Sequence, residues 1–259
     1  MLLTVDVGNT NMVFGLFEQD KLVGNFRLRT TTDTTSDELG ILASEYFYRF
    51  GYQPLDVEAV IIASVVPQIM YSLNSAMIKY FDKTPIVVDV DVDSGMQYHK
   101  SLFQSNERLG TDRSVTNIAA IAKYGAPLIV IDFGTATTVD AIDRDGSYLG
   151  GTIGTGLRVT MDALIKGTAV LPMVELSMPE KIIGTSTVGQ LQAGVVAGYV
   201  GNMEYLITRM KQEMNCDPIR VVATGGLSRL ISENSAMIDV VDRNLTMDGL
   251  RMIYETIRK

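Results

Sequence analysis

Leu3–Gly24 reads LTVDVGNTNMVFGLFEQDKLVG, and Ile129–Gly150 reads IVIDFGTATTVDAIDRDGSYLG. One constant offset aligns the two stretches, so that Asp6 corresponds to Asp132 and the glycine two positions later recurs in both. In each copy an apolar run ends in Asp-x-Gly and three small or polar residues, and a second apolar run follows at once. Each copy therefore predicts a strand, a tight glycine turn and a returning strand.

Turns of this kind have a characteristic chemistry. They direct backbone N–H groups and threonine hydroxyls toward a phosphate, while the aspartate can hold a cation or a water molecule. Because the chain carries the turn twice, we predict two related halves with a nucleotide clamped between them.

The length and charge of the chain narrow the choice of partners. At 259 residues with an internal repeat, we predict two domains, residues 1–115 and 116–259, although no low-complexity linker marks the boundary. The formal net charge of −8 argues against nucleic acid as a partner, since that requires a basic face. A nucleotide remains compatible with this charge, because backbone amides and hydroxyls can form a phosphate site.

Residues that are rare in this chain exclude several classes of site. The one cysteine, Cys216, rules out an intramolecular disulfide, and the one histidine, His99, rules out a histidine-based metal cluster and argues against a Ser/His/Asp triad. Asp, Thr and Gly remain plentiful, and they suit phosphoryl transfer. Met1 leads directly into a strand pattern, and apolar runs such as Ala59–Val66 are too short to span a bilayer, so we expect a cytoplasmic protein without a signal peptide or membrane contact.

The periodicity of apolar residues predicts a mixed α/β sheet in each half. The predicted strands are Leu2–Val7, Val13–Phe17, Lys21–Arg29, Ala59–Ser64 and Pro85–Val88, followed by Leu128–Phe133, Thr138–Ile142, Leu149–Ile153 and Arg220–Ala223. The predicted helices are Ser36–Phe50, Val66–Phe81, Arg113–Lys123, Leu157–Ile165, Thr187–Met214 (with breaks at its glycines), Leu227–Glu233 and Thr246–Arg258.

Four motifs in this order resemble one known family. They are Asp6-Val7-Gly8-Asn9-Thr10, Gly110-Thr111-Asp112-Arg113, the run from Asp132 to Thr138, and Thr224-Gly225-Gly226. Together they resemble the type III pantothenate kinases of the actin-like superfamily, over residues 2 to about 250. The resemblance implies an α/β fold of two ribonuclease-H-like halves related by duplication, each a mixed sheet with flanking helices, and a nucleotide in the cleft.

The resemblance also implies an activity. Members of the family use ATP to phosphorylate the primary hydroxyl of pantothenate to 4'-phosphopantothenate, the first step of coenzyme A biosynthesis, with Mg²⁺ and a monovalent cation (K⁺ or NH₄⁺). They are typically homodimers with the acceptor pocket near the subunit interface, and the glycine-rich Val188–Gly201 would allow close helix packing there. Two alternatives remain: a kinase of another small hydroxylated substrate, and a non-enzymatic nucleotide-binding accessory or regulatory protein.

Candidate nucleotide and cation residues follow from the two turns and from the resemblance. We expect Asp6 to act on the Mg²⁺ shell through water, whereas the resemblance assigns Asp132 to the monovalent cation. The first loop could instead be an ordinary hairpin turn, and Asp132 could be an aspartate that only caps its own turn. Thr224-Gly225-Gly226 could be a plain strand-to-helix turn. The expected ATP-binding residues are Asp6, Val7, Gly8, Asn9, Thr10, Asn11, Met12, Val13, Thr135, Gly225 and Gly226.

Candidate acceptor residues centre on Asp112. The resemblance assigns this carboxylate to deprotonating the pantothenate hydroxyl, and the neighbouring Arg113 would bind substrate or phosphate. Thr187 and Phe103 match family positions near pantothenate; the alternatives are a helix cap for Asp112 or Thr187 and loop packing for Phe103. The expected substrate-binding residues are Phe103, Gly110, Thr111, Asp112, Arg113 and Thr187.

The chain departs from the family pattern at two prolines. Gly150–Gly156 lacks the proline of the family's Gly-Gly-x-Ile-x-Pro-Gly run and has Gly154 and Thr155 before its last glycine, and Asn106 replaces a proline ahead of Gly110. Without proline these positions are less constrained, so the acceptor specificity stays open.

Overall fold

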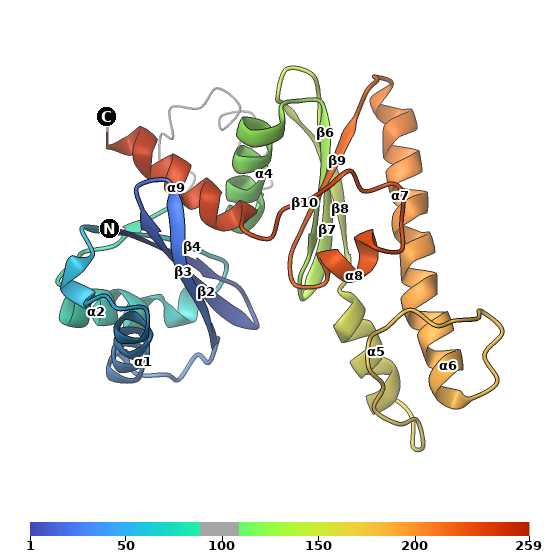
Figure 1. Ribbon diagram of the computed structural model, residues 1–259, viewed down its shortest axis with the longest axis horizontal. Coiled ribbons are helices and arrows are strands. Elements are labelled where there is room, and N and C mark those ends of the chain that lie inside the picture. Colours follow the sequence, from blue (N-terminus) through green and yellow to red (C-terminus); the bar gives the residue numbers. More distant parts are fainter. Residues whose placement is uncertain (89–108, 259) are drawn as a thin grey trace. The chain divides into compact units, whose positions relative to one another are not determined.

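The computed structural model describes residues 1–88 and 109–258, which form two compact units (Figure 1). Unit 1 comprises Met1–Ala119 and Leu245–Lys259, and unit 2 comprises Ala120–Asn244. Each unit contains one copy of the duplicated turn. The terminal helix, which the sequence pattern groups with residues 116–259, packs on the sheet of unit 1.

Unit 1 is built on a five-stranded mixed sheet in the order β3-β2-β1-β4-β5. Neighbours β1, β2 and β3 are antiparallel, whereas β1, β4 and β5 are parallel. The strands are β1 (Leu2–Val7), β2 (Asn11–Glu18), β3 (Lys21–Arg29), β4 (Ala59–Ser64) and β5 (Ile86–Val87). The helices are α1 (Ser36–Arg49), α2 (Met70–Phe81), α4 (Thr111–Tyr124), which continues into unit 2, and α9 (Leu245–Ile257), with short turns η1 (Pro54–Asp56) and η2 (Pro67–Ile69).

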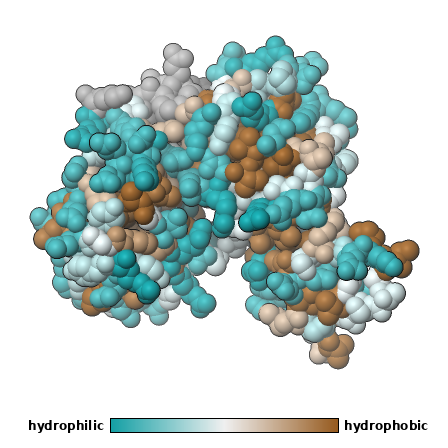
Figure 2. Space-filling model, viewed as in Figure 1, coloured by the Kyte–Doolittle hydropathy of each residue, from teal (hydrophilic) through white to brown (hydrophobic). Residues whose placement is uncertain are grey.

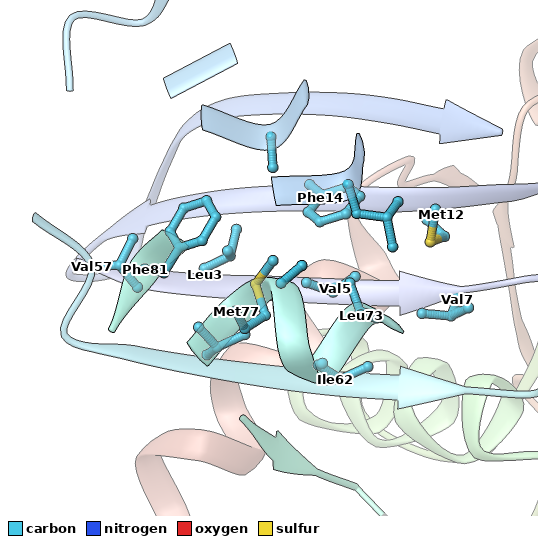
Figure 3. Packing of buried hydrophobic residues seen from close by; sticks show 14 of the residues in the cluster. Leu3, Val5, Val7, Met12, Phe14, Val57, Ile62, Leu73, Met77 and Phe81 are labelled. Atoms are coloured by element: carbon cyan, nitrogen blue, oxygen red, sulfur yellow. The ribbon is translucent and has the colours of Figure 1, made fainter. Parts of the chain in front are cut away.

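The two faces of this sheet are covered by different helices. Residues of one parity along β1, including Leu3 and Val5, are fully buried under α1 and α2, where they form a cluster with Phe14, Met77 and Phe81 (Figure 3). Side chains alternate along a strand, so Thr4 faces the other side, where its hydroxyl lies 3.3 Å from Met247 of α9. This packing explains why the terminal helix belongs to unit 1.

Local signals explain where α1 begins. Thr35 forms a capping box with Glu38: the Thr35 side chain accepts the Glu38 N–H, and the Glu38 carboxylate accepts the Thr35 N–H. This arrangement satisfies two N–H groups that have no partner inside the helix. The sequence predicted a helix that begins at Ser36, and this start is confirmed.

Unit 2 repeats the same plan with the sheet order β10-β9-β6-β7-β8. Its strands are β6 (Leu128–Phe133), β7 (Ala136–Ile142), β8 (Tyr148–Thr155), β9 (Arg220–Thr224) and β10 (Val240–Val241). Its helices are α5 (Leu157–Lys166), α6 (Thr187–Leu191), η3 (Gln192–Ala197), α7 (Gly198–Met214) and α8 (Ser228–Ser232). Residues of α7 and α8 pack on one face of this sheet in a second buried cluster.

Most predicted elements are present, and several strands have the predicted bounds. The segment Thr187–Met214 is helical throughout, and its middle is a π-helix, η3, rather than a break at the glycines. The two-residue strand β10 was not predicted, because so short a run has no periodicity to detect. Within residues 1–88 and 109–258, no helix is long and apolar enough to cross a bilayer.

Candidate active site

The first phosphate loop joins β1 to β2 in unit 1. Gly8 N–H donates to the Asn11 carbonyl at 3.1 Å, which closes the turn, and Asn9, Thr10 and Asn11 are exposed. Thr30, just after β3, holds the turn from outside: its hydroxyl donates to the Gly8 carbonyl at 2.6 Å and its N–H to the Thr10 carbonyl at 3.0 Å. The exposed amides and hydroxyls are therefore carried on a fixed turn, as a phosphate site requires.

The Gly-x-Asp-Arg motif lies at the same end of this sheet. Thr111, the first residue of α4, donates its hydroxyl to the Ser64 carbonyl at 3.2 Å. Ser64 ends β4 directly beside Val7, the last residue of β1 before the phosphate loop. One hydrogen bond and one strand pairing thus connect the predicted base motif to the first phosphate loop within a single unit.

Asp112 lies in the first turn of α4 and is half-buried. Its Oδ1 accepts the Arg113 N–H at 2.8 Å, and a Cβ added at Gly110 would lie 2.6 Å from the same oxygen. The glycine of the motif therefore leaves space for this carboxylate. The helix itself is started by Gly110, whose carbonyl accepts the Ser114 N–H at 3.0 Å, so an N-cap is not the position that Asp112 occupies.

The second phosphate loop joins β6 to β7 in unit 2, as its duplicate does in unit 1. Gly134 N–H donates to the Ala136 carbonyl at 3.1 Å, and Gly134 and Thr135 are exposed. Asp132 is half-buried near the end of β6, where it pairs in register with Thr224 of the parallel strand β9. The structure therefore brings Asp132, at the start of the loop that carries Thr135, together with the Thr-Gly-Gly motif.

Gly225 packs closely against Asp132 and Phe133. A Cβ at Gly225 would overlap Oδ1 of Asp132 and the backbone of Phe133, and the residue has a φ of 89°. Both facts require glycine here. Ser228, fully buried in α8, donates its hydroxyl to the Gly225 carbonyl at 2.7 Å and fixes the turn from the other side.

Gly156 is a second close contact that the sequence analysis did not identify. Its N–H donates to the Thr135 carbonyl at 2.9 Å, and a Cβ there would overlap the carbonyl oxygens of Gly134 and Thr135. This glycine follows β8 and packs on the second phosphate loop, which holds the loop against its own sheet. The only sequence signal was its place in a glycine-rich run, and glycine runs occur in many loops.

The two remaining predicted substrate residues have different outcomes. Thr187 is exposed and is the first residue of α6, but the cap of that helix is Ser186, whose hydroxyl oxygen accepts the Gly189 N–H at 3.1 Å. The hydroxyl of Thr187 is thus not used as the cap. Phe103 lies outside the described residues, as does Asn106.

The donor set at the two aspartates suits hard cations. Among the residues that the structure describes, no group of three or more His, Cys, Asp and Glu side chains gathers in one place. A magnesium or potassium ion would therefore be held by one carboxylate, with phosphate, carbonyl and water oxygens completing its shell, as is common for Mg²⁺ in kinases. Asp6 and Asp132 each supply such a carboxylate, and Gly225 has no Cβ that would overlap Oδ1 of Asp132.

Comparisons with known proteins agree with this geometry. Residues 2–209 match the model of a family described as type III pantothenate kinase. Among solved structures, a conserved putative Baf family transcriptional activator from Campylobacter jejuni is 17% identical with a TM-score of 0.60, covering 98% of this chain and 97% of that one. A putative 2-dehydro-3-deoxygalactonokinase from Sinorhizobium meliloti is 11% identical with a TM-score of 0.59, covering 100% and 96%.

A third similar structure is the activator of the 2-hydroxyisocaproyl-CoA dehydratase from Clostridium difficile with bound ADPNP, at 14% identity and a TM-score of 0.52, covering 99% of this chain and 96% of that one. At these identities the structural likeness shows the fold alone. The predicted fold class, two related α/β halves of the actin-like type, is confirmed.

Proposed function

Because the chain belongs to the type III pantothenate kinase family, we propose which of its residues carry out each part of the reaction. The enzyme transfers a phosphoryl group from ATP to the primary hydroxyl of pantothenate, the first step of coenzyme A biosynthesis. The observation that supports our assignment best is the path from Thr111 through Ser64 to Val7, which joins the acceptor motif to a phosphate loop within unit 1.

Asp112 is the general base. Its carboxylate accepts the proton of the pantothenate hydroxyl while that oxygen forms its bond to the γ-phosphorus and the bond to the β,γ-bridging oxygen breaks, releasing ADP. Transfer of this kind depends mainly on positioning and on charge stabilisation, so a carboxylate that only accepts the proton late in the step suffices. Arg113, adjacent in the same helical turn, contributes a charge-assisted contact to substrate or phosphate.

The two loops hold the nucleotide. Gly8 lets the backbone of the first loop approach phosphate, the exposed Asn9 and Thr10 donate to phosphate oxygens from unit 1, and Thr135 donates from unit 2. The neighbouring Val7, Asn11, Met12 and Val13 shape the first loop, and Gly225 and Gly226 leave room for the adenosine. Gly110 and Thr111 position the acceptor beside Asp112, and Thr187 and Phe103 contact pantothenate.

Two cations complete the assignment. Asp6 would hold Mg²⁺ through water, and Asp132 would hold K⁺ or NH₄⁺. When bound, these ions neutralise the charge of the phosphates during transfer. The support is the carboxylate that each phosphate loop carries at its strand end, and the absence at Gly225 of a Cβ that would overlap Oδ1 of Asp132.

The enzyme is a homodimer in this proposal, as family members typically are. Unit 2 exposes large apolar side chains on β8, on the segment that follows α5 and on α6, and Figure 2 shows hydrophobic surface around α5 and α6. These side chains are Leu149, Ile153, Val170, Met173, Ile182, Ile183 and Val188. An exposed apolar surface of this kind marks an interaction site. Light scattering that gives one protomer mass at micromolar concentration would contradict the dimer.

The remaining parts of the proposal follow from the substrates. ATP and pantothenate are small molecules, so we assign the enzyme to the cytoplasm with neither nucleic acid nor membrane as a partner. The net charge of −8 supports the first exclusion.

ADP release with MgATP, with and without pantothenate and in potassium or sodium buffer, tests the assignment. Asp112→Asn should lose at least about a hundredfold in pantothenate-dependent turnover, because general-base catalysis contributes factors of this size, while it still binds MgATP. Asp20→Asn, in the exposed turn between β2 and β3, is the matched control and should stay at the wild-type rate. Full turnover in Asp112→Asn would contradict the assignment of Asp112 as the general base. Equal rates in potassium and sodium buffer would contradict the monovalent-cation assignment.

A further inference from the structure

Tyr199, the second residue of α7, contacts the sheet of unit 2 in two ways. Its hydroxyl forms a hydrogen bond with the hydroxyl of Thr137 in β7. The centroid of its ring lies 6.4 Å from the ring centroid of Phe133 in β6, at an interplanar angle of 54°. Tyr199 is 8% exposed and Thr137 is 3% exposed. A hydroxyl pair with so little exposed surface contributes more than one at the surface, because less water competes for either group.

The two partners of Tyr199 are the residues that close the second phosphate loop. Phe133 and Thr137 face each other across the turn as paired residues of the antiparallel strands β6 and β7. Only Gly134, Thr135 and Ala136 lie between them, and all three are exposed. Tyr199 therefore touches both ends of the turn whose exposed groups are placed to meet phosphate.

The π-helix explains how Tyr199 reaches this position. One helical segment runs from Thr187 through η3 to the end of α7, and Tyr199 follows η3 by two residues. A π-helical turn accommodates an additional residue, which rotates everything after it by roughly 100° relative to a regular α-helix. Without η3, α7 would present a different side chain to Thr137. π-Helical turns inside α-helices are frequently found at functional sites.

We propose that Tyr199 is a positioning residue for the second phosphate loop, which it holds in the nucleotide-binding conformation through Thr137 and Phe133. The inference rests on the proposed role of that loop. Burial raises the pKa of the Tyr199 phenol, against a smaller lowering effect of the Thr137 hydrogen bond, so the hydroxyl keeps its proton throughout the working pH range. The contact is therefore constant and does not switch with pH.

An open cavity borders the contact between Tyr199 and Thr137. Its volume is about 510 Å³, and Thr137, Tyr199 and Asn202 all contribute to its wall. Gly194 and Gly198, on the same wall, have no side chain that could move in to brace β7. Removing the phenolic oxygen should thus loosen the turn between β6 and β7 while the ring still packs against Phe133.

The test measures MgATP affinity directly, by isothermal titration calorimetry without pantothenate, and compares KM values in the full reaction. In Tyr199→Phe we expect the Kd and the KM for ATP to rise roughly three- to tenfold, because that is the effect of losing one hydrogen bond. The KM for pantothenate should stay within about twofold of the wild-type value. Tyr205→Phe is the matched control, on the same helix with 63% of its surface exposed, and should leave all three constants unchanged.

Two substitutions at Thr137, the hydrogen-bond partner of Tyr199, distinguish a positioning role from a general effect on stability. Thr137→Val should reproduce the weaker ATP binding. Thr137→Ser should bind ATP nearly as the wild type does, because serine keeps the hydroxyl. The double variant Tyr199→Phe/Thr137→Val should bind ATP no more weakly than either single variant, because both changes remove the same hydrogen bond. A Tyr199→Phe variant that melts at a lower temperature but binds ATP as Tyr205→Phe does would overturn the proposal, as would additive effects in the double variant.

The outcome also separates this inference from the proposed function. Wild-type protein that binds MgATP but shows no pantothenate-dependent turnover would contradict the proposed function, whereas the comparison of ATP affinities would still decide the role of Tyr199. Wild-type protein that binds no MgATP would overturn both.

Discussion

Oδ2 of Asp242 accepts a hydrogen bond from the hydroxyl of Tyr124 at 2.7 Å. The same oxygen forms an ion pair with Lys123, and Oδ1 accepts the Asn244 N–H at 3.1 Å. Lys123 and Tyr124 end α4, the helix through which the chain enters unit 2, and Asp242 precedes α9, through which it leaves. The two places where the chain passes between the units are therefore tied together by one carboxylate.

We predict that Asp242→Asn lowers the free energy of unfolding at pH 7 by about 1–3 kcal/mol, because it removes a hydrogen-bonded charge and with it the ion pair to Lys123, which is only 29% exposed. Urea unfolding measures the change. Asp145→Asn, in the exposed turn between β7 and β8, is the control and should remain within about 0.5 kcal/mol of wild type.

The same contact predicts a dependence on pH. Burial alone would raise the pKa of Asp242, but the hydrogen bonds from Lys123 and Tyr124 together outweigh it and hold the pKa below its ordinary value. A carboxyl whose pKa is lowered by folding stabilises the protein above its unfolded pKa, about 3.9, and this contribution is lost as the pH falls through the folded pKa. The difference between wild type and Asp242→Asn should therefore shrink below about pH 4; a constant difference from pH 7 to pH 3 would contradict this.

Gly225→Ala tests the contact between the Thr-Gly-Gly motif and Asp132. The added methyl group would overlap the Asp132 carboxylate and the Phe133 backbone, at a φ that disfavours any side chain. We expect a loss of about 1–3 kcal/mol in unfolding free energy and a higher potassium concentration for half-maximal activation. Gly226→Ala is the stability control, since nothing lies within 4 Å of its Cβ position. Equal unfolding free energies for Gly225→Ala and Gly226→Ala would show that the close packing of Gly225 against Asp132 does not affect stability.

Gly156→Ala tests the support of the second phosphate loop. With φ −64° and ψ 151°, the backbone at Gly156 suits any residue, so the whole effect must come from the overlap with the carbonyls of Gly134 and Thr135. Displacing that loop should lower kcat/KM for ATP roughly ten- to a hundredfold. Gly154→Ala, two residues earlier with open space at its Cβ position, should stay within about twofold in steady-state kinetics. If both variants behave alike, the loop does not depend on Gly156.

The core of unit 1 offers a test that does not involve the active site. Phe26 is buried and stacks between two rings, 4.6 Å from Phe14 and 4.3 Å from Tyr46, with interplanar angles of 6° and 3°. Phe26→Ala should cost about 3–5 kcal/mol in chemical denaturation, from lost burial and the cavity that remains. Tyr48→Ala, on α1 with 58% of its surface exposed, should cost less than about 1 kcal/mol. A similar loss in both would mean that the stacked rings pack no better than the surface.

The strands and the long helices could be predicted because their signals are local. The strand β1 and its duplicate β6 read as apolar runs that end in Asp-x-Gly, and α1 begins at a capping box within four residues. Of the candidate site, the two phosphate loops and the Gly-x-Asp-Arg motif were also predicted, since each is a short contiguous pattern. The duplication then implied that both halves share one fold, and the two sheet orders agree.

What the sequence could not determine are contacts between segments far apart in the chain. Gly225 meets Asp132 only because β9 pairs in register with β6, and Gly156 meets Thr135 only because β8 returns beside β7. The packing of α9 on β1 and the π-helical turn that aims Tyr199 at Thr137 are decided in the same way. Local sequence determined the elements and the chemistry of each loop. The tertiary structure decided which residues hold those loops in place, because register and close packing depend on the surfaces that meet and not on the order of residues within one segment.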